Sequence, residues 1–402
     1  MKLFQKLLLG PAALGLLSPL AVSASEANFK GTNDYSQRDF EVSIESFKPL
    51  SSRNPLLAGG EGSTNNTSDS SDFDVDSFSS TTSASFTANF AIGSIENNST
   101  LVSSSLASTK THAGFDYVME LTTGFSGNDS LDVEIEAGTL GQIDVLDFVT
   151  DGANLAVASI SYTKDLGDRL TVFFGDGAAG SSLYNTACVY EGVTDALDDC
   201  GNLNSAIDVE FGTAAGLSAD LGNGFAAAIG IETQGNNGKG VFTDEGADAF
   251  GAQVSYTGDN YGVSLTWANI EDTTSGVLDS DQGATQSTAV NAYFTPNLNN
   301  FPSISVGFES NHDDSAALND SNDESTHYFV GLQWDELGNG TLGAAVGTKT
   351  PTAENGTAQN QYEVFYAYNY ADGITITPLF YNRETTGSVD DTGVVVKTTF
   401  EF

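Results

Sequence analysis

Acidic residues at every second position are the feature of this sequence with the clearest chemical potential. In the segment 129–138, Asp132, Glu134 and Glu136 share one side of an extended chain, opposite Leu131, Val133 and Ile135. Paired carboxylates can act as general acid and base, but only in a dry pocket that shifts their pKa values. Carboxylates beside water instead raise the local concentration of cations and disfavour anions.

The same alternation selects a set of candidate inward-facing residues. They are Asp116, Glu120, Asp132, Glu134, Glu136, Glu210 and Glu363, together with the basic Lys397. The three histidines show no metal-ligand spacing, and no nucleotide-binding loop, nucleophile elbow or zinc-protease motif appears. We therefore predict that the chain is not an enzyme and that it has no cofactor and no metal site.

The two cysteines, Cys188 and Cys200, lie together in a long polar connection, 175–207. In a secreted chain, two cysteines in one loop predict a disulfide. It would close a loop of about a dozen residues and stabilise the fold by roughly 2–3 kcal/mol. A catalytic or metal-binding role is poorly supported, because the CxxC spacing is absent and the loop contains no histidine.

The charge of the chain excludes one class of partner. Lys and Arg number 13 against 54 Asp and Glu, for a net charge of −41. Nucleic-acid binding requires basic patches, so we predict no nucleic-acid partner. The 25 Phe and 14 Tyr residues are too many for a disordered chain. No stretch after the leader approaches the length of a transmembrane helix.

The first residues predict export. Lys2 and Lys6 precede an apolar core from Leu7 to Val22, and Val22-Ser23-Ala24 is a small-residue cleavage site. We interpret 1–24 as a signal peptide cleaved near Ala24. Residues 25–82 are polar and predict an N-terminal periplasmic extension or linker.

From residue 83 to residue 402 the apolar residues recur with period two, which is the pattern of half-buried strands. About sixteen strands are predicted by this pattern. They lie at 83–95, 114–125, 129–138, 154–164, 168–174, 208–221, 225–233, 246–257, 260–270, 286–296, 301–310, 325–334, 340–348, 360–370, 373–383 and 392–402.

Short and long connections alternate between these strands. Gly222-Asn223-Gly224 and Ala371-Asp372 are tight turns, whereas 139–153 and 175–207 are long and polar. A transmembrane barrel with short turns at one end and long loops at the other requires this rhythm. The predicted fold class is an all-β antiparallel transmembrane barrel of about 16 strands, with 14 or 18 as the other even counts.

The C-terminus resembles a known signature. The chain ends on Phe400, Glu401 and Phe402 behind alternating apolar residues, which is similar to the last strand of bacterial outer-membrane barrels. The alternative is an ordinary edge strand. In general trimeric porins, the third long loop folds into the pore. That resemblance would place 175–207 at a constriction with Asp195, Asp198 and Asp199, and the alternative is an external lid held by the disulfide.

A second resemblance covers the leader MKLFQKLLLGPAALGLLSPLA, Asn33-Asp34-Tyr35-Ser36 and Val394 to Phe402. These segments are similar to porins of marine unicellular cyanobacteria, which form channels for small solutes and inorganic ions. That family usually carries a surface-layer-homology domain after the leader. Residues 25–80 contain no Trp and no such pattern, so the resemblance does not extend to anchoring on the cell wall.

These resemblances imply an outer-membrane porin for passive diffusion of small hydrophilic solutes and ions, with a preference for cations. The implied partners are outer-membrane lipid, lipopolysaccharide and the barrel-assembly machinery. Porins of this size often form trimers, so a homotrimer is one expected assembly. The alternative function is a secreted acidic surface-layer protein or adhesin, whose composition would look the same.

Overall fold

The computed structural model describes residues 81–96, 110–139, 143, 145–146, 152–208, 212–234, 240–243, 247–271, 283–298, 300–314, 323–385 and 390–402. The predicted signal peptide lies outside these residues, and so do Glu210 and nearly all of the predicted extension. Among the described residues, no helix is long and apolar enough to cross a membrane.

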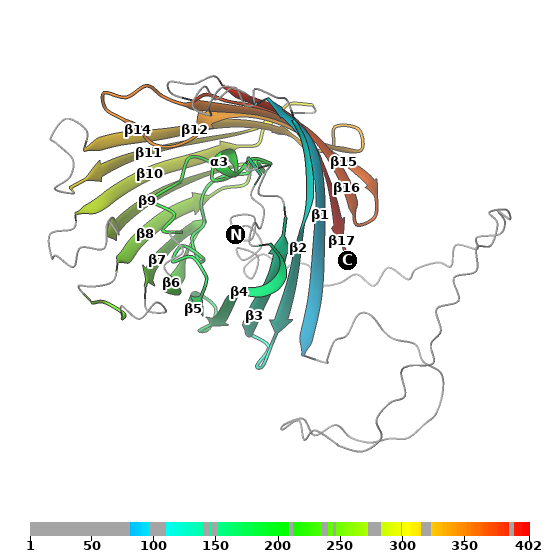
Figure 1. The fold of residues 1–402 in the computed structure, drawn as a ribbon. Coiled ribbons are helices and arrows are strands. Elements are labelled where there is room, and N and C mark those ends of the chain that lie inside the picture. Colours follow the sequence, from blue (N-terminus) through cyan, green and yellow to red (C-terminus); the bar gives the residue numbers. More distant parts are fainter. Residues whose placement is uncertain are drawn as a thin grey trace, which may run out of the picture. The chain divides into compact units, whose positions relative to one another are not determined.

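Almost all of the regular structure is β-strand (Figure 1). The strands are β1 Thr82–Glu96, β2 Lys110–Thr123, β3 Asp129–Gly138, β4 Gly152–Asp165, β5 Leu170–Asp176, β6 Thr213–Gly222, β7 Phe225–Thr233, β8 Asp248–Thr257, β9 Tyr261–Glu271, β10 Ala284–Phe294, β11 Ser303–Asp313, β12 Glu324–Trp334, β13 Gly340–Thr348, β14 Thr352–Ala353, β15 Asn360–Ala371, β16 Ile374–Arg383 and β17 Asp391–Glu401. One helical turn, α3 Asp195–Asp198, interrupts the connection from β5 to β6.

The strands form one closed antiparallel barrel. Apart from β14, each strand pairs with the next strand along the chain, and β1 pairs with β17 to complete the ring. The two-residue strand β14 pairs with β12 beyond the end of β13 and adds no row, so 17 strands less one give 16 rows. The predicted sixteen-strand barrel is therefore confirmed, and the counts of 14 and 18 are excluded.

Several predicted boundaries differ from the observed ones, and the strand predicted at 114–125 begins already at Lys110. The predicted strand 208–221 begins only at Thr213, since the chain before it belongs to the connection from β5. The predicted strand 168–174 shifts to Leu170–Asp176. The tight turn Gly222-Asn223-Gly224 is confirmed, and Asn223 has φ 55°, a left-handed value that Asn adopts more readily than most residues.

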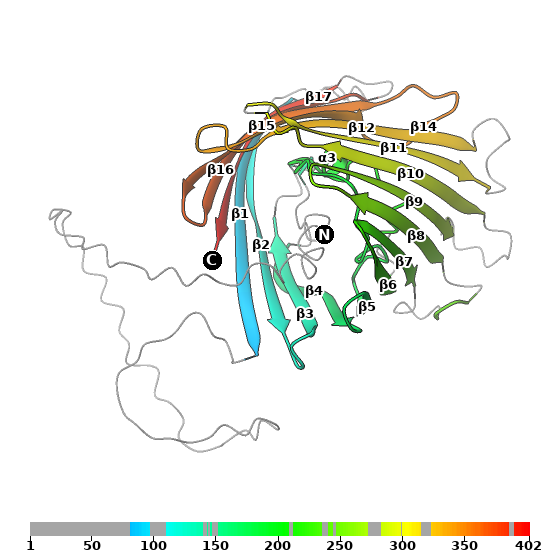
Figure 2. The same cartoon turned by 180° about the vertical axis from the view of Figure 1, so that it is seen from behind.

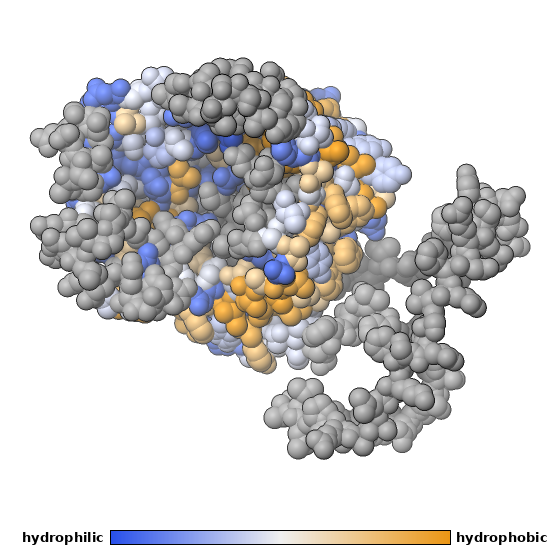
Figure 3. Space-filling view, in the orientation of Figure 1, coloured by the Kyte–Doolittle hydropathy of each residue, from blue (hydrophilic) through white to orange (hydrophobic). Residues whose placement is uncertain are grey.

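The alternation of side chains separates two faces. On β17, Val394 is 54% exposed whereas Val395 is fully buried, and on β1, Phe90 is 54% exposed whereas Asn89 is 4% exposed. The outward residues are mostly apolar, and Figure 3 shows them gathered on the outer wall near β1, β2 and β3. The inward residues are mostly polar or small. The wall thus has an apolar outside and a polar inside, as the period-two pattern predicts.

The barrel closes at the seam between β1 and β17. Ten residue pairs from Thr87↔Glu401 to Glu96↔Thr392 define its register. Next to the Thr87↔Glu401 pair, Phe86 N–H donates to the Phe402 carbonyl at 2.9 Å and Phe402 N–H donates to the Phe86 carbonyl at 3.1 Å. The two rings stack with centroids 5.4 Å apart. Because β17 pairs on both sides, it is not an edge strand, and the terminal aromatic residue completes the closure.

We predict that deletion of Phe402 weakens this closure. The deletion removes two backbone hydrogen bonds and one aromatic pair, which together are worth roughly 1–3 kcal/mol. The folded barrel should therefore unfold at a lower urea concentration, followed in detergent by the heat-modifiable shift in gel migration. Phe125→Ala, at an exposed ring in the turn after β2, is the control. An unchanged midpoint for the deletion would show that the seam does not depend on Phe402.

Candidate functional site

The connection between β5 and β6 lies inside the barrel. We call residues 177–208 the inward loop, and Figures 1 and 2 both show it within the ring of strands. Its backbone bonds to inward side chains of successive strands. Ala187 N–H donates to Ser264 Oγ of β9 at 3.0 Å, and Val189 N–H donates to Ser305 Oγ of β11 at 3.1 Å. The loop therefore follows one side of the inner wall and is not an external lid.

One buried carboxylate, Glu363 on β15, holds the middle of the inward loop. It accepts hydrogen bonds from Tyr190 Oη at 2.6 Å, from Thr194 N–H at 2.9 Å and from Val193 N–H at 3.3 Å. Burial, and then the Glu363 carboxylate itself, raise the pKa of the Tyr190 hydroxyl, so it stays protonated as a donor. Three donors converge on one carboxyl group, and an ionised carboxylate has only acceptor atoms to offer them, which gives the loop a strong attachment.

A second buried carboxylate, Glu309 on β11, holds the end of the inward loop. It accepts from Asn204 N–H at 3.1 Å, from Ser205 N–H at 2.9 Å and from Ser205 Oγ at 2.7 Å. Cys200 lies between these two attachment points along the loop, and its carbonyl accepts from Asn291 Nδ2 of β10 at 2.8 Å. The wall thus satisfies the loop's backbone groups where they are buried away from water.

Glycines on the wall allow the loop backbone to approach closely. A Cβ at Gly307 of β11 would overlap the Cys200 carbonyl, and one at Gly230 of β7 would overlap the Gly180 carbonyl. At Gly331 of β12, a Cβ would lie 2.7 Å from the Tyr190 ring. Because these three positions have no side chain, the loop can lie directly against the backbone of the wall.

Part of the connection between β3 and β4 packs on the inward loop. Ile143, Val145 and Leu146 are each at most 5% exposed and belong to a buried cluster with Tyr190 and Leu197. Asp195 N–H donates to the Val145 carbonyl at 3.0 Å, and Leu146 forms a β-bridge with Thr194. Ile143, Val145 and Leu146 of this connection therefore share one apolar cluster with the inward loop.

The predicted disulfide between Cys188 and Cys200 is present. It joins two residues 12 apart in sequence, with Cα atoms 6.4 Å apart. Val189 and the Cys200 carbonyl, at or beside its two ends, bond to β11 and β10. The disulfide thus closes the part of the loop that the wall holds.

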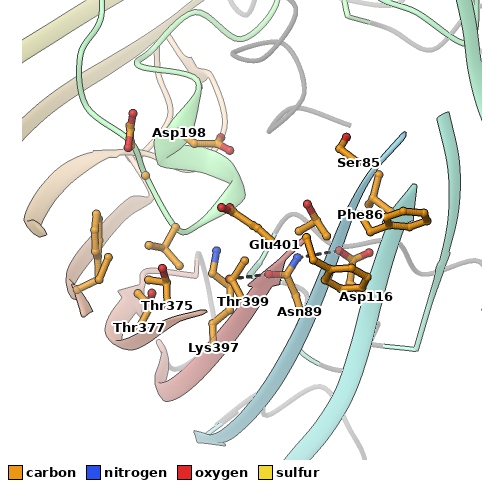
Figure 4. A pocket seen from close by; sticks show the side chains of 18 of the residues that line it. Ser85, Phe86, Asn89, Asp116, Asp198, Thr375, Thr377, Lys397, Thr399 and Glu401 are labelled. Atoms are coloured by element: carbon orange, nitrogen blue, oxygen red, sulfur yellow. Dashed lines mark hydrogen bonds between the residues drawn. The ribbon is translucent and has the colours of Figure 1, made fainter. Parts of the chain in front are cut away.

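The space between the inward loop and the opposite wall is a cavity of about 740 Å³. Its lining comes from the loop, from β1 to β3 and from β13 to β17. Acidic residues dominate its charged lining: Asp116, Glu120, Glu134, Glu136, Glu191, Asp198 and Glu401. Lys397 is the lysine among the described lining residues. Figure 4 shows Lys397 and Glu401 reaching in from β17, with Asp198 on the loop.

A hydrogen-bonded chain orders the cavity wall at β17, β1 and β2. Thr399 Oγ1 donates to Asn89 Oδ1 at 2.7 Å, and Asn89 Nδ2 donates to Asp116 Oδ2 at 3.1 Å (Figure 4). Glu120 and Glu134 occupy directly opposed positions on β2 and β3. Their polar partners are neutral: Ser85 Oγ donates to Glu120 at 3.4 Å and Ser159 Oγ donates to Glu134 at 3.2 Å.

The predicted site residues differ in whether they line the cavity. Asp116, Glu120, Glu134, Glu136, Lys397 and Asp198 line the cavity. Asp132 lies on the same face of β3 and accepts from Ser130 Oγ at 2.8 Å, and Asp199 borders a smaller cavity within the inward loop. Glu363 differs from the expectation. Its side chain points inward but is 1% exposed, because the loop covers it.

Sequence reasoning missed Glu309 and the wall glycines. Glu309 alternates with Phe308 and Ser310 just as the predicted acids alternate with their neighbours, so the pattern contained its inward direction. The apolar residues of the β3–β4 connection, in the run Ile143 to Leu146, were also a signal, since a loop in water has little reason to carry them. Within the described residues, no group of three potential metal ligands is close enough to hold an ion.

Comparison with known proteins identifies the fold. No protein-family description and no curated protein matches the sequence. OprB of Pseudomonas putida, in its high-pH structure, aligns with 80% of this chain and 94% of its own at 9% identity, with a TM-score of 0.58. OmpT of Vibrio cholerae, an outer membrane protein lacking loop L8 in that structure, aligns with 80% and 99% at 12% identity, with a TM-score of 0.54. At such low identities the similarity establishes the barrel fold.

We predict that Glu363→Gln releases the centre of the inward loop. In Gln, an NH2 group replaces one carboxylate oxygen and faces the N–H and O–H donors of the loop. The lost hydrogen bonding costs roughly 1–3 kcal/mol at a buried site. Hydrogen exchange at Val193 and Thr194 should then accelerate by roughly tenfold to a hundredfold. Glu324→Gln, at the start of β12, is the matched control. Its carboxylate is exposed and lies 3.1 Å from His312 Nδ1 of the neighbouring strand β11. Equal protection in E363Q and the parent chain would contradict the role assigned to Glu363.

Replacement of both cysteines by serine tests the disulfide. We expect C188S/C200S to lose roughly 2–3 kcal/mol from the free energy of unfolding, because the open chain gains conformational entropy. Denaturant titration of the folded barrel measures the loss. The parent chain in a thiol reductant provides the matched comparison, and an unchanged midpoint in both would show that the wall alone fixes the loop.

Proposed function

We propose that this chain is an outer-membrane porin that allows passive diffusion of small hydrophilic solutes and ions, with a preference for cations. The observation that carries the proposal is a polar cavity inside a closed barrel, bordered on one side by the inward loop. The loop occupies one side of the interior and leaves the acidic wall of β2 and β3 beside the cavity. Such an arrangement suits a narrowed, water-filled passage.

The outer face supports a membrane location. Large apolar residues with roughly half of their surface exposed recur around the barrel, among them Ile92, Val254, Leu265 and Phe308. In water, an apolar surface of this extent would promote aggregation, whereas in a bilayer it contacts lipid tails. Exposed aromatic residues at the short-turn end, such as Phe294 and Tyr370, fit an interfacial belt. We infer that lipid and lipopolysaccharide surround a multi-pass barrel.

Other expectations complete the proposal. The leader is a signal peptide cleaved near Ala24, residues 25–82 are a periplasmic extension, and the barrel-assembly machinery inserts the exported chain. We also infer, from the resemblance of the leader and of the last strand, that the chain is related to porins of marine unicellular cyanobacteria. A homotrimer is the expected assembly. Each of these rests on the sequence and not on the barrel geometry.

The preference for cations follows from the charge around the cavity. Seven carboxylates line it with Lys397, and four of them lie on β2 and β3. A passage with carboxylates on the wall and on the loop concentrates cations and repels anions. Catalysis forms no part of the proposal, because the sequence contains no nucleophile, metal-ligand or nucleotide-binding motif that would direct such chemistry. The adhesin alternative gives no reason for a polar cavity within a closed barrel.

We predict discrete conductance steps when the purified, detergent-folded protein is added to a planar bilayer. Under a KCl gradient, the reversal potential should move toward the potassium equilibrium potential. The double variant E120Q/E134Q should lower the cation-to-anion permeability ratio by roughly threefold to tenfold, because two charges leave a partly screened passage. Asp259→Asn, in the exposed turn between β8 and β9, removes one charge away from the cavity and is the control.

Two results would contradict the proposal. Anion selectivity in the parent chain would keep the channel but overturn the assignment of the carboxylates. A folded protein that never conducts would favour a closed barrel or the surface-layer function.

A further inference from the structure

The pair Glu120 and Glu134 places two carboxyl groups side by side on the wall of the cavity, where they repel each other when both are ionised. The two residues are direct cross-strand neighbours on the inward face of β2 and β3. Like charges at directly opposed positions destabilise a sheet. Glu136 lies two residues further along β3 and also lines the cavity. The hydroxyl groups of Ser85 and Ser159 contribute hydrogen bonds but no positive charge. A mobile cation between the carboxylates would remove the repulsion.

The same cavity also has an apolar side. Val193 of the inward loop, Phe365 and Ala367 of β15 and Val118 of β2 line it together with the carboxylates. Val118 stands opposite Glu136 in the register of β2 and β3, so apolar and acidic groups are neighbours on the same wall. A hydrated inorganic ion gains nothing from apolar groups. An organic cation does, because it buries its hydrocarbon part while its charge faces a carboxylate.

The size of the cavity fits such a solute. Its volume of about 740 Å³ lies within the range of roughly 300–1,000 Å³ that is typical of small-molecule sites. Lys397 on β17 adds a single positive group at another part of the lining, paired in register with Ala91 of β1. Purely anionic solutes such as phosphates would meet the carboxylates first, and neutral sugars would leave both the charge and the apolar side unused.

We propose that the cavity is a binding site for small organic cations, in which an ammonium or guanidinium group lies at Glu120, Glu134 and Glu136 and a short apolar body lies against Val118 and Val193. The proposal rests on the proposed channel function and narrows its substrate class to organic amines. Such a solute dwells in the passage longer than potassium and therefore interrupts the potassium current while it crosses.

Benzylammonium is the probe, with two matched compounds as controls. Ammonium has the charge without the apolar body, and benzyl alcohol has the body without the charge. We expect benzylammonium to block the single-channel potassium current at a concentration about tenfold lower than either control, because both kinds of contact contribute. E120Q/E134Q should raise the blocking concentration by about tenfold and Val118→Thr by about threefold, whereas Asp259→Asn should leave it unchanged.

Calorimetry of the detergent-folded protein measures binding without conduction and separates the two proposals. Potassium current without benzylammonium block or binding heat would overturn the binding site while the porin stands. Binding heat that E120Q/E134Q weakens, in a protein that never conducts, would support the site and overturn the porin. Equal block by benzylammonium and ammonium, or by benzylammonium and benzyl alcohol, would overturn the two-part recognition. Loss of block in Asp259→Asn would also overturn it.

Discussion

The hydrogen-bonding requirement of the backbone is the constraint on which the rest of this structure depends. A strand in contact with hydrocarbon has no water to satisfy its N–H and C=O groups, so the sheet must have no free edge. The chain meets this requirement by pairing β17 with β1 as well as with β16. Closure fixes the alternation of side chains for every strand at once, and it is therefore the origin of both the apolar outside and the polar inside.

The same requirement extends to the barrel interior. A loop that leaves water for the inner wall brings its own backbone groups, and these need partners there. Glu309 and Glu363 accept six hydrogen bonds from five residues of the inward loop. Ser264, Ser305 and Asn291 add further bonds to the loop. Glycines of the wall, such as Gly230 and Gly307, lie where a Cβ would overlap the loop backbone. The inward polar side chains on this side of the barrel therefore bond to the loop and are not available to a solute.

The number and positions of the strands could be predicted, because apolar and polar residues alternate within each strand and turn residues such as Asn223 separate the strands. The disulfide could be predicted because two cysteines in one exported loop have few other uses. The depth of burial could not. Glu120 and Glu363 show the same local alternation, yet the first borders the cavity and the second lies beneath the inward loop. The two residues differ only in whether the inward loop, which is far away in the chain, covers them. The period-two pattern shows which way a side chain points and not what covers it.

This distinction changes how the acidity of the chain bears on selectivity. A net charge of −41 describes the whole sequence, whereas a passing ion responds to charges within about a Debye length that water does not fully screen. Glu309 and Glu363 are fully buried and bonded to the inward loop, so their charge is already opposed by oriented donors. On β2 and β3, the side chains of Glu120 and Glu136 are half-buried and border the cavity, whereas Glu134 is 6% exposed. The loop's position therefore decides which few carboxylates face a solute, and a shift of the loop by one strand would alter selectivity without any change in composition.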